Sequence, residues 1–301
     1  ISKIYGVPLG DDVVKTIEAI EQMGALVEII KKENEADLII TGIDTNRKKQ
    51  NSVILNAGSS ATLFRIIAPI SLMLYEEVKI NANPDLLNRP MDEMNKYMDV
   101  LIEENSFIIS NFDVKNQMVV DGSVSSQYAS GLLFALSLIG KDCELIVDNL
   151  KSKDYLTMTK DALNDFGIEI LQNNNHYSIK NNIFTKVEKE ICIDYSQVSH
   201  FLVLAACKKK MIFMGLEKSN QPDIRILSIL RLMGLNINNT LGFSEVKKSR
   251  LKSIRIIDVT NCIDLAPILF VVSAYVNANI LFVGTERLAY KESNRKWNRN
   301  L

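Results

Sequence analysis

Hydrophobic residues change their spacing in a repeating way along this 301-residue chain. A stretch of apolar positions at helical spacing ends in a glycine, where a helix end favours a left-handed residue. The apolar positions then alternate with polar ones, as in a strand, and a polar turn leads to a second strand. The clearest copies begin with helices at 13–24, 157–167 and 224–234, and their first strands follow at 25–30, 168–170 and 235–237.

These copies are spaced more widely than the roughly 20 to 50 residues of solenoid repeats, so the pattern favours an α+β fold of repeated subdomains. A degenerate copy spans 91–109, and a polar, charged segment at 181–190 divides the chain. We therefore expect a first lobe at 1–189 and a second at 190–301. Further apolar helices are expected at 61–74, 130–138, 198–207 and 264–276.

The charge balance limits the possible partners. With 35 basic and 36 acidic residues the formal net charge is −1, so overall charge does not drive binding to nucleic acid or to an anionic membrane. Any anion site must be local. The longest apolar runs are shorter than the roughly 18 residues of a membrane span, and no signal-peptide pattern opens the chain. We therefore expect a cytoplasmic protein.

The cysteines and histidines do not predict a metal site. Cys143, Cys192, Cys207 and Cys262 lack the close spacing that zinc ligands need, and we expect all four to be reduced and buried. The two histidines, His176 and His200, are expected to have only structural roles.

Hydroxyl and amide side chains gather just before one apolar helix, in the segment 121–128 with Ser125, Ser126 and Gln127. Such neutral donors and acceptors, next to the free N–H groups of a helix start, suit a polyhydroxylated or phosphorylated ligand. The alternative is an ordinary N-cap. A second group of hydroxyls, at 59–62, opens another helix with Arg65 one turn further on. Arginine is suited to bidentate binding of carboxylate or phosphate.

Three more clusters carry charge. The sequence Ser152-Lys153-Asp154-Tyr155 precedes the helix expected at 157, where a capping turn is the alternative. Arg89 stands before Pro90, which is favoured at a helix start. Asp264 opens the helix at 264–276, and cationic residues follow at 287–295. Asp264 is therefore either a helix cap or a general base kept ionised by cations.

Taken in order, these clusters resemble the motifs of the 5-enolpyruvylshikimate-3-phosphate (EPSP) synthase family. Several short motifs in the right order are more specific than any one of them, and together they cover the chain from Ile1 to about Arg295. The matching segments are Asp11-Asp12, the hydroxyls before Arg65, Arg89-Pro90, the segments 122–127 and 152–155, Gln221-Pro222-Asp223, Asp264-Leu265-Ala266-Pro267 and Lys291-Glu292-Ser293-Asn294-Arg295.

The resemblance implies a two-lobed enolpyruvyl transferase fold of repeated βαβαββ units, of the inside-out α/β barrel type, with the second lobe incomplete. It implies a monomeric transferase of the shikimate pathway, in aromatic amino-acid biosynthesis. The enolpyruvyl group of phosphoenolpyruvate moves to the 5-hydroxyl of shikimate 3-phosphate and phosphate leaves, with no cofactor or metal. We expect the polar side chains of the first lobe and the acid and bases of the second to converge on one cleft.

The resemblance also implies residue roles. Asp264 would take the proton of the 5-hydroxyl, while Lys291 and Glu292 would handle protons at C3 and at the tetrahedral adduct. Contacts to shikimate 3-phosphate would come from Ser125, Ser126, Gln127, Ser152, Tyr155 and Arg287. Contacts to phosphoenolpyruvate would come from Thr62, Arg65, Arg89 and Arg295.

Some positions depart from the family pattern. Ala61 replaces a glycine that lets phosphoenolpyruvate approach the backbone, and its methyl group could narrow that site. Asn294 stands where aspartate is usual, Ala289 where arginine is common and Pro222 where glycine is common. These departures leave open a degenerate, non-catalytic ligand-binding copy.

Two further classes of protein compete with this interpretation. The related transferase that acts on UDP-N-acetylglucosamine shares the fold, but it usually carries a reactive cysteine in a mobile loop, and no cysteine lies in a comparable place here. A repeated α+β interaction domain, whose polar clusters are all helix caps, would not explain why Lys291, Arg295 and Arg89 fall beside three separate caps.

The resemblance predicts low turnover for the 301 residues alone. The family's first Lys-Ser…Arg motif would precede Ile1, and its last arginine and lysine would follow Leu301, so we expect a fragment. Each missing charged contact is worth about 2 to 4 kcal/mol of transition-state stabilisation. A steady-state assay of phosphate release should therefore detect little or no activity, and ordinary turnover would contradict this expectation.

Overall fold

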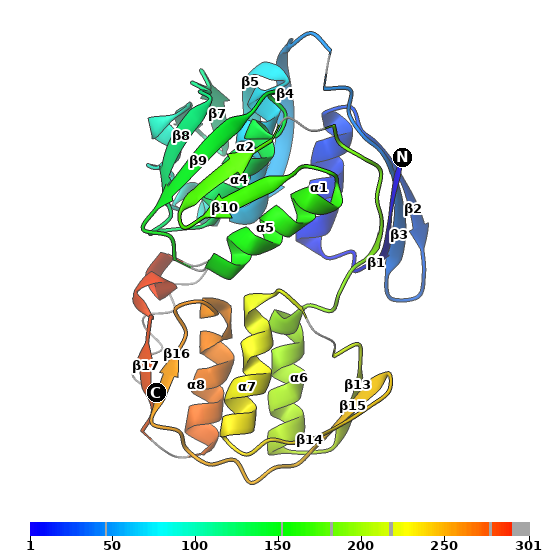
Figure 1. Ribbon diagram of the computed structural model, residues 1–301, viewed down its shortest axis with the longest axis vertical. Helices are drawn as coiled ribbons and strands as arrows, with labels where there is room; N and C mark the ends of the chain where they lie inside the picture. Colours follow the sequence, from blue (N-terminus) through cyan, green and yellow to red (C-terminus); the bar gives the residue numbers. More distant parts are fainter. Residues whose placement is uncertain (46, 152, 181–182, 217–218, 277–278, 291–301) are drawn as a thin grey trace. The chain divides into compact units, whose positions relative to one another are not determined.

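The computed structural model describes residues 1–45, 47–151, 153–180, 183–216, 219–276 and 279–290 (Figure 1). The chain divides into two compact units. Unit 1 comprises Ile1–Leu150 and Thr159–Ile191, and unit 2 comprises Lys151–Met158 and Cys192–Leu301. The boundary that the sequence predicts, after residue 189, lies close to the division between the units after Ile191. That these units are the two predicted lobes stays a prediction.

One sheet of unit 1 has the strand order β12-β1-β3-β2. Strand β1 runs parallel to β12 and antiparallel to β3, so the first and last strands of the unit are neighbours. Helix α1 buries Ile17 against Val7 and Leu38 of this sheet. The elements are β1 (Ser2–Val7), α1 (Asp11–Gln22), β2 (Leu26–Lys31), β3 (Ala36–Thr41) and β12 (Glu188–Glu190).

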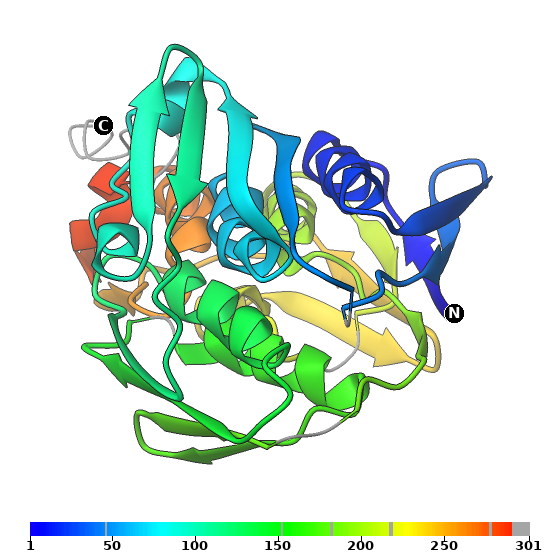
Figure 2. The ribbon, with the colours of Figure 1, turned by 90° about the horizontal axis from the view of Figure 1, so that it is seen from above.

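The other two sheets of unit 1 share one connection pattern. In each, two parallel strands are joined by a buried helix, and an antiparallel hairpin completes the sheet. Figure 2 shows the first of these sheets, coloured blue to teal, beside helix α2. Its elements are β4 (Gln50–Gly58), α2 (Ala61–Leu72), β5 (Tyr75–Ala82), α3 (Pro84–Leu87), a 3-10 turn η1 (Met94–Lys96), β6 (Asp99–Glu103) and β7 (Ser106–Ser110). The second comprises β8 (Gln117–Asp121), α4 (Gln127–Leu136), β9 (Cys143–Asp148), α5 (Lys153–Asp165), β10 (Ile170–Asn173) and β11 (His176–Ile179). The residues of α5 up to Met158 belong to unit 2.

Unit 2 has three helices side by side, with all their N-termini at the same end (Figure 1). Leu202, Leu230 and Leu269, one from each helix, are fully buried in a common core. An antiparallel sheet and a parallel strand pair complete the unit. The elements are α6 (Tyr195–Cys207), β13 (Met211–Met214), η2 (Pro222–Ile224), α7 (Arg225–Leu232), β14 (Asn236–Thr240), β15 (Phe243–Lys247), β16 (Ile256–Asp258), η3 (Ile263–Leu265), α8 (Ala266–Tyr275), β17 (Leu281–Val283) and η4 (Glu286–Tyr290).

The mixed α and β architecture expected from the sequence is confirmed, but some local expectations are wrong. The helix expected at 157 begins at Lys153, so Asp154 and Tyr155 lie in its first turn rather than in a capping turn before it. In the degenerate copy at 91–109, the short η1 turn replaces the helix, and strands β6 and β7 follow it as in the other copies.

Two further expectations need correction. The strand expected at 168–170 begins only at Ile170. Cys143, Cys207 and Cys262 are buried as expected, but Cys192 is exposed because it lies in an irregular segment after β12. No helix in the described parts of the chain is long and apolar enough to cross a membrane.

Helices α2 and α4 approach each other so closely that only glycine fits at one position. A Cβ atom on Gly131 would lie 2.2 Å from the carbonyl oxygen of Arg65 and 3.0 Å from Pro69 Cγ. Backbone oxygen cannot move aside as the end of a flexible side chain can. The crossing therefore fixes the relative position of the two helix starts, and with it the side chains at those starts.

Replacing Gly131 by alanine should destabilise the protein by about 1 to 3 kcal/mol, because the added methyl group forces the helices apart. Urea unfolding followed by circular dichroism would measure the change. Gly42→Ala is the matched control, because Gly42 is exposed and its added Cβ would meet nothing within 4 Å. Equal stabilities for the two variants would contradict the close crossing.

Candidate active site

Three of the predicted phosphoenolpyruvate and shikimate 3-phosphate contacts meet in unit 1. Arg65 Nη1 donates a hydrogen bond of 2.9 Å to Gln127 Oε1, and Gln127 Nε2 donates one of 2.6 Å to Thr62 Oγ1. Thr62 and Arg65 lie near the start of α2, and Gln127 is the first residue of α4. The close helix crossing thus brings together side chains that are far apart in the sequence.

Arg65 also holds the loop that follows α3. Its Nη2 donates to the carbonyl oxygen of Pro90 at 3.1 Å, and its guanidinium carbon lies 4.8 Å from the centre of the Tyr128 ring. Tyr128 donates its hydroxyl to the same carbonyl oxygen at 2.6 Å. Burial raises the pKa of Tyr128, so its phenol stays protonated and remains a donor. Arg65 is buried.

Arg89, a predicted phosphoenolpyruvate contact, immediately precedes Pro90, whose carbonyl oxygen accepts both of these hydrogen bonds. Its backbone N–H donates to the carbonyl oxygen of Leu86 at 3.1 Å, which ends the short helix α3. The Arg65 and Tyr128 contacts at Pro90 therefore fix the backbone from which the Arg89 side chain extends. Arg89 itself is half-buried.

The serines before α4 differ in their roles. Ser125 Oγ accepts a hydrogen bond from the backbone N–H of Gln127 at 3.2 Å. Ser126, which is buried, occupies the N-cap position but makes no side-chain cap hydrogen bond. The N-cap interpretation of this segment therefore does not describe Ser126. At the start of α2, by contrast, Ser60 is a true cap and accepts from the N–H of Leu63.

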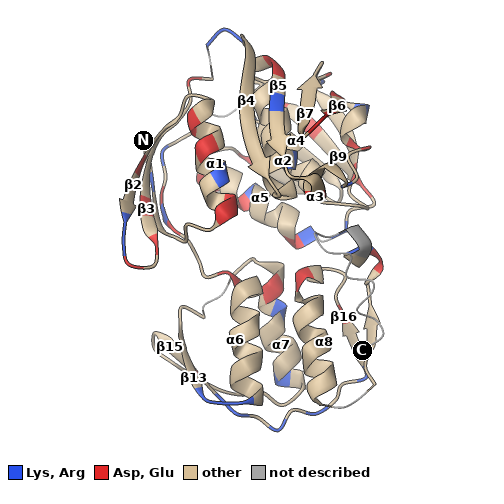
Figure 3. Cartoon of the chain, turned by 180° about the vertical axis from the view of Figure 1, so that it is seen from behind, with Lys and Arg blue, Asp and Glu red and all other residues tan. Residues whose placement is uncertain are grey.

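Unit 2 gathers two hydroxyl side chains, those of Tyr155 and Ser196, around one aspartate pair. The Tyr155 hydroxyl donates to Asp264 Oδ2 at 3.1 Å and lies 3.5 Å from Asp223 Oδ2. Ser196 Oγ donates to the same oxygen of Asp223 at 2.5 Å. The residues lie at the starts of α6, α7 and α8 and in the first turn of α5, and Figure 3 shows acidic residues at the starts of those three helices.

Burial and neighbouring carboxylates set the protonation states of this cluster. Burial first, and then the charges of Asp264 and Asp223, raise the pKa of Tyr155, so its phenol stays protonated. Burial and the Asp223 charge likewise raise the pKa of the Cys262 thiol to about 12. Burial lowers the pKa of Arg287, while Tyr155 and Asp264 oppose this shift. Arg287 Nη2 donates to the carbonyl oxygen of Thr260 at 2.8 Å.

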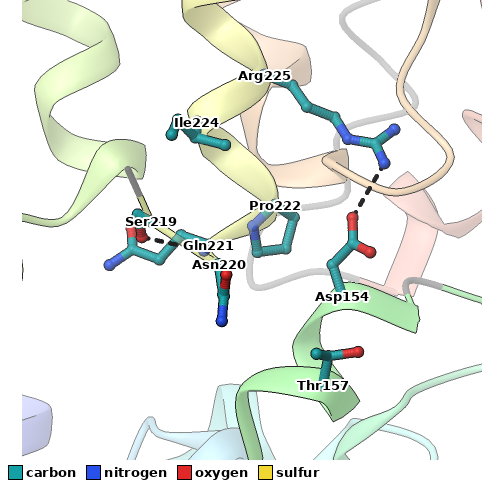
Figure 4. Close-up of a pocket in the computed structure, with 8 residues that line it drawn as sticks. All are labelled: Asp154, Thr157, Ser219, Asn220, Gln221, Pro222, Ile224 and Arg225. Carbon is teal, nitrogen blue, oxygen red and sulfur yellow. Dashed lines mark hydrogen bonds and ion pairs between the residues drawn. The ribbon is translucent and has the colours of Figure 1, made fainter. Parts of the chain in front are cut away.

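A polar pocket of about 240 Å³ lies beside this cluster, within unit 2. Asp154 and Arg225 lie on one side of it and form an ion pair of 3.0 Å (Figure 4). Gln221 braces the neighbouring helix, since its Oε1 accepts from the N–H of Tyr195 and its Nε2 donates to the carbonyl oxygen of Ile193. Thr157, Ser219, Asn220, Pro222 and Ile224 complete the lining.

Four predicted site residues, Ser152, Lys291, Glu292 and Arg295, lie outside the described residues, as does Asn294. Among the residues that are described, no group of three or more His, Cys, Asp or Glu side chains could hold a metal ion. Asp264 is not the N-cap of α8 and its carboxylate is turned to Tyr155, so the capping interpretation does not describe it.

Sequence reasoning assigned no role to Asp223, Ser196 or Arg225, and it considered Asp154 only as a possible helix cap. Asp223 is the last residue of the family motif Gln221-Pro222-Asp223, and this motif could have indicated a role for it. Ser196 and Arg225 belong to ordinary amphipathic patterns, and only the packing of the helix starts brings them to Asp223 and Asp154.

The sequence profile of EPSP synthase (3-phosphoshikimate 1-carboxyvinyltransferase) matches residues 1–297. The chain belongs to this family. It is 31% identical to a 3-phosphoshikimate 1-carboxyvinyltransferase of Clostridium botulinum (strain Eklund 17B / Type B), with 98% of this chain and 70% of the relative covered. A relative with the same name from Clostridium beijerinckii is 30% identical, with 98% and 71% covered.

Solved structures support the fold of this EPSP synthase family member. The EPSP synthase of Acinetobacter baumannii superimposes with a TM-score of 0.73 at 21% identity, covering 98% of this chain and 70% of that one. The enolpyruvyl transferase NikO from Streptomyces tendae superimposes with a TM-score of 0.57 at 15% identity, covering 91% and 67%. The resemblance seen in the sequence motifs is thus confirmed at the level of the family.

The cysteine environments predict selective thiol reactivity. In the native protein at pH 8, a maleimide should modify Cys192 rapidly, because it is the exposed cysteine. Cys262 should react only after unfolding, because its thiol is buried and holds its proton up to a pKa of about 12. Mass spectrometry would count the modified thiols, and Cys192→Ser should abolish the fast reaction. Fast labelling of Cys262 in folded protein would contradict the buried cluster.

Proposed function

We propose that the two clusters described above act on the same substrates, in the transfer of the enolpyruvyl group from phosphoenolpyruvate to the 5-hydroxyl of shikimate 3-phosphate. The observation that carries this proposal is the 3.1 Å hydrogen bond between Tyr155, an expected substrate contact, and Asp264, the expected base. It places a hydrogen-bond donor and a proton acceptor side by side. The family membership and the names of the relatives support the reaction.

The unit 1 cluster is proposed to bind substrate. Ser125, Ser126 and Gln127 offer neutral hydrogen-bonding groups to shikimate 3-phosphate, and the Arg65 and Thr62 bonds hold the Gln127 amide in one orientation. Arg65 and Arg89, with Thr62, are proposed to favour the anionic phosphoenolpyruvate. Preorganised donors of this kind stabilise charge without reorganising during the reaction.

The unit 2 cluster is proposed to move protons. A proton adds to C3 of phosphoenolpyruvate, the 5-hydroxyl oxygen bonds to C2, and Asp264 takes the hydroxyl proton. The tetrahedral adduct then loses phosphate from C2 and a proton from C3, which restores the double bond. Lys291 and Glu292 are proposed to carry out the proton steps at C3. Contacts to shikimate 3-phosphate are proposed for Tyr155, Arg287 and Ser152, and a contact to phosphoenolpyruvate is proposed for Arg295. Nothing in this scheme requires a second copy of the chain, so we propose a monomer. We also propose that it acts in the cytoplasm, as expected from the sequence.

Binding of shikimate 3-phosphate tests these assignments without requiring turnover. Isothermal titration calorimetry should show that Gln127→Ala and Tyr155→Phe each weaken binding by about tenfold, because each variant removes one hydrogen-bonding group from the proposed site. Gln117→Ala and Tyr275→Phe are matched controls that remove an exposed amide and a phenol elsewhere, and they should bind like the native chain.

The result can contradict the proposal in two ways. Native protein that does not bind shikimate 3-phosphate would argue against a substrate site in this chain. Native protein that binds it while Gln127→Ala and Tyr155→Phe bind equally well would argue that the site lies elsewhere. Binding by a full-length relative of this chain without any phosphate release would instead favour the degenerate ligand-binding copy.

A further inference from the structure

Asp223 is a buried carboxylate to which the proposed reaction assigns no step. Its side chain is only 5% exposed, although a buried carboxylate is costly unless hydrogen bonds compensate it. Ser196 donates to Oδ2 at 2.5 Å, and the Tyr155 hydroxyl lies 3.5 Å from the same oxygen. Asp223 is therefore fixed by α6 and directed toward the residue on α5 that contacts Asp264.

The Tyr155 phenol has a single proton to donate, and two carboxylates lie near it. A phenol donates one hydrogen bond, and at 3.1 Å Asp264 is the nearer acceptor. The 3.5 Å separation from Asp223 is too long for a strong O–H···O bond, but a small rotation of the phenol would shorten it. The phenol thus has a second acceptor within reach, supplied by a different helix start.

This second acceptor matters when the first is engaged. A base must direct a carboxylate oxygen to the hydroxyl that it deprotonates. If Asp264 turns to a substrate hydroxyl, the buried Tyr155 phenol loses this hydrogen bond, and the loss of a hydrogen bond by a buried donor is unfavourable. Asp223 can take over that hydrogen bond without moving far, because Ser196 holds its carboxylate in place.

We propose that Asp223 is a positioning residue, the alternative acceptor that keeps the Tyr155 ring in place when Asp264 engages a substrate hydroxyl. The Asp264 step of this inference rests on the proposed function, whereas the contact between Asp223 and Tyr155 does not. Arg287 and Cys262 also face the phenol of Tyr155, and neither supplies a second carboxylate.

A separate contact supports the same arrangement. Two residues after Asp223, Arg225 forms the ion pair with Asp154, the neighbour of Tyr155 on α5 (Figure 4). The start of α7 therefore meets the first turn of α5 at two points. Because the ion pair fixes the distance between these segments, the carboxylate of Asp223 stays near the phenol whichever acceptor the phenol uses.

The first test needs no ligand. Urea unfolding is measured for Asp223→Ala, for Tyr155→Phe and for the double variant. The three changes in unfolding free energy relative to the native chain give the coupling between the two side chains. The same cycle is then repeated in an Asp264→Ala background. We expect a coupling of at most about twofold in the unfolding constant when Asp264 is present, and about fivefold or more in its absence, because the phenol then depends on Asp223. Tyr177→Phe combined with Asp223→Ala is the matched control and should be additive, since Tyr177 bonds Gln172 in unit 1.

Equal coupling in both backgrounds, or none in either, would overturn the proposal. If Asp223 has a merely structural role, Asp223→Ala should lower the stability by the same amount whether residue 155 is tyrosine or phenylalanine. If Asp264→Ala does not fold, the second test decides alone.

The second test uses shikimate 3-phosphate and calorimetry. Asp223→Ala should weaken binding by about tenfold, while Asp223→Asn, which keeps a carbonyl acceptor, should stay within about threefold of native affinity. In the Tyr155→Phe background, Asp223→Ala should cause no further loss. A similar loss with and without the phenol would overturn the proposal. If the native chain does not bind the ligand at all, the proposed function fails, and the urea cycle still decides the role of Asp223.

Discussion

The hydrogen bond between Tyr155 and the Asp264 carboxylate is the interaction on which the functional interpretation depends. The phenol is buried, and both burial and the two carboxylates raise its pKa, so it is a permanent donor. Buried polar groups of this kind stabilise the fold only in a complete network. The same network therefore positions the helix starts of unit 2 and holds the Asp264 carboxylate, which we propose as the base.

The helix starts of the two units carry different kinds of side chain. In unit 1 the starts of α2 and α4 carry hydroxyl, amide and guanidinium groups, which can donate hydrogen bonds to an anion. The positive end of each helix also favours negative charge. In unit 2 the starts of α7 and α8 carry Asp223 and Asp264, so the positive helix end stabilises protein carboxylates instead. A transfer between two polyanions needs both kinds of site, one to neutralise substrate charge and one to accept a proton.

Sequence reasoning found much of the fold because the apolar periodicity of the buried helices is strong. It also found Thr62, Arg65 and Gln127, which meet in the structure, through the order of the family motifs. It missed Asp223 and Ser196 because their contacts join segments 27 residues apart, and no local pattern encodes that separation. It also placed the start of α5 too late, because the first turn has little apolar periodicity and is stabilised by Asp154 and Tyr155 contacts with distant residues.

That misplaced helix start has a physical consequence for the site. Within a helical turn, neighbouring residues point in directions about 100° apart, since there are 3.6 residues per turn. Asp154 and Tyr155 therefore reach different partners, Arg225 in one direction and the aspartate pair in the other. In an irregular capping turn, one of these contacts could be lost without affecting the other. On a helix, the ion pair fixes the rotation of the first turn about its axis, and this rotation sets where the phenol of Tyr155 meets Asp264.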